Sequence, residues 1–105
     1  MVRQEVLVTV LRFYTQENPK ERDSYVAVCT LLWESPSIVW LKGLHGNLTR
    51  KVLRDLVQWL LDNKISLVKA IRASGSLPLA TYTRGEYCEI DVEKRREEFN
   101  KLLRG

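Results

Sequence analysis

The hydrophobic pattern near the start of the chain repeats every two residues, in three apolar runs. This period is typical of β-strands, and it predicts strands over residues 5–15, 24–33 and 38–43. In the first run one face would carry Val6, Val8 and Val10 and the other Leu7, Leu11 and Phe13, with both faces at least partly covered. A polar loop is expected over residues 16–23 and a short turn over residues 34–37. Joints this short predict an antiparallel meander.

The period then changes to that of a helix. Residues 48–63 form the strongest amphipathic pattern in the chain, with leucines and valines on one face and charged residues on the other. Asn47 or Thr49 would cap this helix, and Asp62–Asn63 would end it. An alternating run over residues 65–72 predicts a strand parallel to residues 38–43, because a strand, a helix and a strand with short joints form a right-handed βαβ unit.

The remaining pattern predicts a hairpin and a closing helix. After a break over residues 73–78, residues 79–91 read as two strands that turn at Arg84–Gly85, and residues 91–103 as a helix capped by Asp91. With no repeat or linker, we expect one domain over residues 1–105. Its fold class is α+β, with a mostly antiparallel sheet in the order βββ-α-β-ββ-α and one parallel βαβ pair.

Composition narrows the class of protein. Hydrophobic residues make up 45% and charged residues 29% of the 105 residues, a globular balance. The longest apolar runs fall short of the roughly 20 residues of a membrane span, and the start lacks a secretory pattern, so we expect no membrane association and a cytoplasmic protein. Cys29 and Cys88 form no CxxC pair and are expected to be reduced and packed. His45 alone cannot complete a metal site.

Positive charge gathers in the middle of the chain. Residues 35–85 carry eight lysines and arginines against two aspartates, whereas each flank has one more acidic than basic residue. An anionic ligand would be attracted if these side chains share a face. The alternative is that they are scattered, solvated charges.

The joint GLHGNLTRK, residues 43–51, is the best-placed candidate anion site. A helix N-terminus presents unpaired amides and partial positive charge, glycines let backbone approach a ligand, and the first helical turn is basic. The predicted binding residues are Gly46, Asn47, Leu48, Thr49, Arg50 and Lys51. The alternative is a plain strand-to-helix joint with solvated side chains.

Residues 38–73, IVWLKGLHGNLTRKVLRDLVQWLLDNKISLVKAIRA, resemble the central part of GNAT-type acetyltransferases. The resemblance implies that turn amides hold the pyrophosphate of acetyl-CoA, that pantetheine lies between two splayed parallel strands, and that an acetyl group is transferred to an amine. It also implies a reduced member of the kind found in phages or prophages. HGNLTRK lacks the glycine pattern of the family's turn, so a degenerate, non-catalytic relative stays open.

Other functions also stay open. Glu34 and Tyr82 are the candidate general bases, although a deprotonated amine would need none. The basic segment with Trp33, Trp40 and Trp59 is compatible with a nucleic-acid-binding module. A structural or interaction protein would associate through an exposed edge strand or through Trp33 and Trp40.

Overall fold

The computed structural model describes residues 7–15, 25–72 and 77–105. Six strands and two helices follow the predicted order, and the fold is α+β. The elements are β1 (Val8–Phe13), β2 (Ala27–Ser35), β3 (Ile38–Gly46), α1 (Arg50–Asp62), β4 (Leu67–Ile71), β5 (Tyr82–Arg84), β6 (Tyr87–Asp91) and α2 (Arg96–Arg104).

The strands form one mixed sheet in the order β1-β2-β3-β4-β6-β5. β1, β2 and β3 make the predicted antiparallel meander, and β6 pairs antiparallel with both β4 and β5. β3 and β4 are parallel and are connected through α1, so the predicted βαβ unit is confirmed. A right-handed crossover is the usual hand for such a unit.

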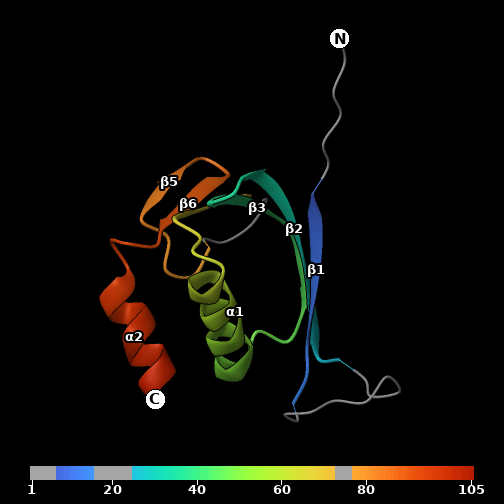
Figure 1. The fold of residues 1–105 in the computed structure, drawn as a ribbon. Helices are drawn as coiled ribbons and strands as arrows, with labels where there is room; N and C mark the ends of the chain where they lie inside the picture. Colours follow the sequence, from blue (N-terminus) through green and yellow to red (C-terminus); the bar gives the residue numbers. More distant parts are fainter. Residues whose placement is uncertain (1–6, 16–24, 73–76) are drawn as a thin grey trace.

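Both helices lie on the same side of the curved sheet (Figure 1). The core fills the space between the two helices and the sheet, because alternate residues of the central strands point towards the helices and are buried. Leu31, Val39 and Val68 line this face of the sheet, and Phe99 of α2 is fully buried against it. Trp33 meets Trp59 of α1 with ring centroids 5.8 Å apart. The opposite face of the sheet is covered by no described helix.

The joint between β3 and α1 is shorter than predicted. β3 extends to Gly46 rather than ending at residue 43, because β2 pairs with it along its whole length, as far as Ala27 opposite Gly46. α1 begins at Arg50, so Leu48 is not helical. The joint therefore comprises only residues 47–49.

The closing helix and the hairpin also differ from prediction. α2 begins at Arg96 rather than at residue 91, because Asp91 still belongs to β6 and Val92 donates to the carbonyl of Ser66 at 3.0 Å. Asp91 Oδ1 accepts from the Lys94 amide at 3.2 Å, so Asp91 caps the intervening turn and not α2. The hairpin turns at residues 85–86, one residue later than predicted.

The remaining expected boundaries shift by a few residues. β2 continues to Ser35, so the predicted turn over residues 34–37 shrinks to residues 36–37. The predicted loop over residues 16–23 lies outside the described residues, as does most of the predicted break over residues 73–78. No helix among the described ranges is long and apolar enough to cross a membrane.

β1 is covered on one face only, whereas we expected partial cover on both. Phe13 is buried and Leu11 packs against the core, but Val8 and Val10 on the other face are 53% and 47% exposed. The reason is that both helices lie on the Phe13 side of the sheet. Association through this edge strand stays a prediction.

Candidate functional site

A cleft opens where β3 and β4 separate. The two strands pair in parallel from Ile38 opposite Leu67 to Leu41 opposite Ala70, after which β3 continues alongside β2 alone. The gap between them has a volume of about 190 Å³. It is lined by Leu41, Lys42, Gly43, Leu44, Ala70, Ile71 and Arg72. The carboxyl ends of parallel strands are the usual position for a ligand in an open sheet.

Two cations border this cleft. Lys42 lies in β3, directly after Leu41, the last residue of β3 that pairs with β4. Arg72 directly follows the end of β4. The Arg72 amide donates to the Glu86 carbonyl at 2.8 Å, which ties the end of β4 to the neighbouring hairpin. The cleft therefore combines exposed strand backbone with positive charge, an arrangement suited to an anionic, extended ligand.

Gly46 of the predicted anion site is required by the fold itself. Its φ is +110°, and a β-carbon added there would collide with the carbonyl oxygen of Val26 at the start of β2. The predicted close approach exists, but the group approached is this backbone. Gly46 therefore lets the end of β3 lie close against the backbone of Val26 and leads the chain into the joint.

Two amides of the joint already have acceptors. The Asn47 amide donates to the Val26 carbonyl at 3.1 Å, and the Thr49 amide donates to the Asn47 carbonyl at 3.0 Å. Thr49, not Asn47, is the helix cap, because its Oγ1 accepts from the Val52 amide at 3.2 Å. An anion at this helix end would therefore meet the amides of Arg50 and Lys51, since the first amides of a helix have no intrahelical acceptor.

The first turn of α1 is basic and contains no acidic residue. Lys51 is paired with Asp55 one turn later, Nζ to Oδ2 2.8 Å, an exposed ion pair. Arg50 is exposed, and its guanidinium lies against Gly105 at the end of α2. Leu48 in the joint is 48% exposed. The six predicted residues thus form one continuous stretch at the start of α1, mostly accessible to solvent.

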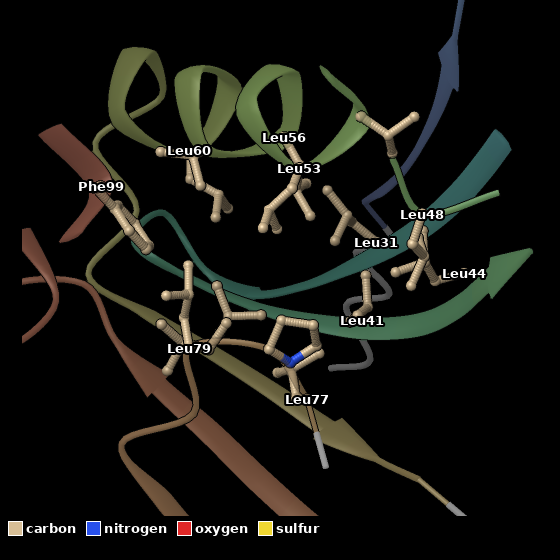
Figure 2. Close-up of a pocket in the computed structure, with 15 residues that line it drawn as sticks. Leu31, Leu41, Leu44, Leu48, Leu53, Leu56, Leu60, Leu77, Leu79 and Phe99 are labelled. Atoms are coloured by element: carbon tan, nitrogen blue, oxygen red, sulfur yellow. The ribbon is translucent and has the colours of Figure 1, made fainter. Parts of the chain in front are cut away.

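An apolar cavity of about 90 Å³ lies between α1 and the sheet (Figure 2). Leu31 and Leu41 of the sheet and Leu53 and Leu56 of α1 face each other across it. Leu44 and Leu48 border one end, beside the start of α1, and Phe99 borders the opposite end. Every residue that lines it is apolar: Leu31, Leu41, Leu44, Leu48, Val52, Leu53, Leu56, Val57, Leu60, Val68, Leu77, Pro78, Leu79, Ile90 and Phe99.

Arg95 holds one wall of this cavity in place. Its Nε donates to the carbonyl of Leu79 at 3.1 Å and its second guanidinium nitrogen to the carbonyl of Ala80 at 2.9 Å. No role was predicted for Arg95 from the sequence. The signal that was available is its spacing, three residues after Val92 and four before Phe99, which places it among the apolar residues of the predicted helix.

The open face of the sheet carries an aromatic and charged cluster around Trp40. The ammonium groups of Lys42 and Lys69 lie 4.9 and 5.4 Å from the centre of a Trp40 ring. Glu34 accepts hydrogen bonds from the Trp40 indole at 3.0 Å and from Lys69 at 3.0 Å. These bonds, that from Trp40 first, hold the pKa of Glu34 below its ordinary value. Glu34 is therefore a weak proton acceptor near neutral pH.

The predicted base Tyr82 lies next to this cluster. Its ring meets Tyr87 edge to face with centroids 6.3 Å apart, and Tyr87 in turn meets Trp40 at 6.0 Å. Burial, and then a hydrogen bond to Glu89, raise the pKa of Tyr87 to about 12. Tyr87 therefore keeps its proton at neutral pH.

The middle segment's cations do not share one face. Lys42 and Lys69 lie over Trp40 on the open face, whereas Arg50, Lys51 and Arg54 belong to α1 on the helical face. The sheet separates the two groups (Figure 1). The cations of residues 35–85 therefore do not form one positively charged surface. Lys42 and Arg72 are the two that meet at the cleft.

The two cysteines and the histidine form no reactive site in the described residues: the cysteines are packed in the core and the histidine is exposed. Cys29 and Cys88 are free and buried, and burial raises the pKa of Cys29 to about 12. His45 lies on β3 and is exposed. Within the described ranges, no group of three or more His, Cys, Asp or Glu side chains is arranged to hold a metal ion.

Comparisons of the chain with protein-family models, with curated proteins and with solved structures found no match.

Proposed function

We propose that this chain is a small GNAT-like domain that binds a CoA thioester in the cleft between β3 and β4. The observation that carries the proposal is the end of the parallel pairing at Leu41 and Ala70, which leaves a cleft between Lys42 and Arg72. In the family that residues 38–73 resemble, pantetheine occupies such a gap between parallel strands. Pantetheine is an extended chain with two amides, and strand edges offer matching hydrogen-bonding groups.

The start of α1 supplies the second half of the proposed site. The pyrophosphate would lie against the amides of Arg50 and Lys51, with the side chain of Arg50 and the helix dipole adding positive charge. An anion there would offset the unfavourable placement of two basic residues in a first helical turn. The amides of Asn47 and Thr49 would not contribute, because both already have acceptors.

Acetyl transfer to an amine is the reaction that the resemblance implies. Glu34 does not suit the role of base, because its carboxylate is held by Trp40 and Lys69 and its pKa is lowered. The proposed reaction therefore uses an amine that arrives deprotonated and attacks the thioester carbonyl directly. The C–N bond forms, the C–S bond breaks, and the departing CoA thiolate takes up the proton that the amine loses. A relative that binds CoA without transfer would use the same cleft.

The open face favours nucleic acid less than the cleft favours CoA. Lys42 and Lys69 cover the Trp40 ring, so this indole is not free to stack on a base. Glu34, Glu89 and Asp91 on the same face would repel phosphates. Binding of a short oligonucleotide, with strong dependence on salt, would be the result that favours this second class.

The test is a titration with CoA and acetyl-CoA, followed by amide NMR. We expect shifts at residues 42–44, 50–51 and 71–72. Replacement of Arg72 by Met should weaken binding about tenfold, because a hydrogen bond to a charged group is worth roughly 1.5 kcal/mol. Lys101→Met on the exposed side of α2 removes the same charge elsewhere and should leave the affinity unchanged. The absence of shifts at millimolar CoA would overturn the proposal.

A further inference from the structure

We propose that the apolar cavity under α1 is the binding site for the acyl chain of the donor, and that this chain is about four carbons long. The inference rests on the proposed function, since it names the class of thioester that the cleft would hold. It concerns a different part of the molecule from the cleft: the cavity lies on the helical side of the sheet, between α1 and the strands (Figure 2).

The cavity and the cleft adjoin each other. Leu41 and Leu44 contribute to the lining of both, because β3 forms one side of the cleft and part of the cavity floor. Leu44 and the exposed Leu48 border the end of the cavity beside the start of α1. Because the pyrophosphate would lie at the α1 end of the cleft, the acyl end of the ligand would enter the cavity beside Leu41, where β3 and β4 separate.

The chemistry of the two spaces differs sharply. The cleft has Lys42 and Arg72 on its border, whereas only apolar residues line the cavity. Apolar cavities stay dry and take up apolar molecules. An apolar chain attached to a polar, anionic carrier matches both spaces at once. A bare acetyl group, with one methyl, would leave the cavity mostly unfilled.

The volume sets the length of the chain. A cavity of roughly 150 Å³ holds benzene, with its six carbons. By proportion, the 90 Å³ found here holds about four carbons. Each methylene moved from water into this space should strengthen binding about fourfold. Butyryl-CoA should therefore bind about fifteenfold more tightly than acetyl-CoA, and the gain should stop at longer chains.

The experiment measures dissociation constants by calorimetry for CoA and for its acetyl, butyryl, hexanoyl and decanoyl thioesters. We expect the tightest binding near butyryl, with shifts of the methyl signals of Leu41, Leu53 and Val57 in the butyryl complex. Leu53→Phe would fill the cavity and should remove the preference for butyryl while it leaves the affinity for CoA unchanged. Leu61→Phe, on α1 but outside the cavity lining, is the matched control and should keep the preference.

Each outcome decides a different point. Equal affinity for CoA and all its thioesters would overturn the acyl site and leave the proposed function standing. Sodium butyrate provides a separate probe: if it shifts the cavity methyl signals while no CoA species binds, the cavity takes up a short apolar chain, but CoA binding and the cavity's role as the donor's acyl site are both overturned. If neither butyrate nor any thioester shifts these signals, both are overturned. Should Leu53→Phe fail to fold, Leu56→Phe replaces it, because Leu56 lines the cavity but not the cleft.

Discussion

At the scale of single residues, Gly46 controls how the chain leaves the sheet. Its positive φ and its contact with the Val26 carbonyl leave no space for a side chain. A glycine in a sequence suggestive of phosphate binding is thus explained by packing of backbone on backbone. A loss of CoA binding on its replacement would report a misfolded joint, and Arg72 is the better probe of the ligand.

Gly46→Ala should lower the free energy of unfolding by about 3 kcal/mol, because the strain of a positive φ and a steric collision with the Val26 carbonyl act together. Urea denaturation measures this. Gly85→Ala is the control: it also has a positive φ, +61°, but no atom lies within 4 Å of the added carbon. It should cost about 1 kcal/mol. Equal losses at the two positions would show that the collision with β2 is relieved by a shift of the joint.

Cys29 gives a second prediction at this scale, from its burial. Because burial raises its pKa from 9.0 to about 12, the folded protein keeps the thiol neutral where the unfolded chain ionises. This contribution to stability is complete below pH 9 and is lost as the pH rises from 9 towards 12. The free energy of unfolding should fall there by up to about 1.4 kcal/mol per pH unit, and less steeply in Cys29→Ala.

The thiol itself offers a direct measurement. At pH 8 neither Cys29 nor Cys88 should react with a thiol reagent in the native protein, whereas both should react in denaturant. Native reactivity of Cys29 at the rate of a free thiol would contradict the buried position in the sheet.

At the scale of elements, the start of α1 depends on one side chain. Thr49→Ala should cost about 1 kcal/mol in unfolding free energy, because the Val52 amide loses its acceptor. Thr49→Ser keeps the hydroxyl and should recover most of this. Asn47→Ala should change stability by less than about 0.5 kcal/mol, since it is the backbone of Asn47 that forms the hydrogen bonds described for the joint. A larger loss at Asn47 than at Thr49 would reverse the assignment of the cap.

The elements also show what the sequence could and could not predict. Their order, the antiparallel meander and the parallel pair follow from the change of period and from short joints. The extension of β3 to Gly46 does not, because it depends on pairing with β2 across the sheet. The late start of α2 depends on the contact of Val92 with Ser66, 26 residues earlier.

The candidate site also has parts that local sequence predicts and parts that depend on how the elements pack. The helix start, with Arg50 and Lys51, was predictable because capping and charge are local. The resemblance implied a gap between two splayed parallel strands, but the position of the cleft could not be read from the residues, since it depends on the β3–β4 register, which ends at Leu41. The cavity was not predictable either, because the leucines around it have the pattern of any packed core, and the unfilled space depends on how three elements meet.

At the scale of the whole molecule, four residue pairs between β3 and β4 join a three-stranded meander to the rest of the sheet. The cavity lies across this seam: Leu31 and Leu41 come from the meander side, Val68 and Ile90 from the other. A molecule that fills the cavity would adhere to both sides together. A bound ligand would then raise the unfolding temperature of the whole fold. The added stability would grow with the logarithm of the ligand concentration once this exceeds the dissociation constant.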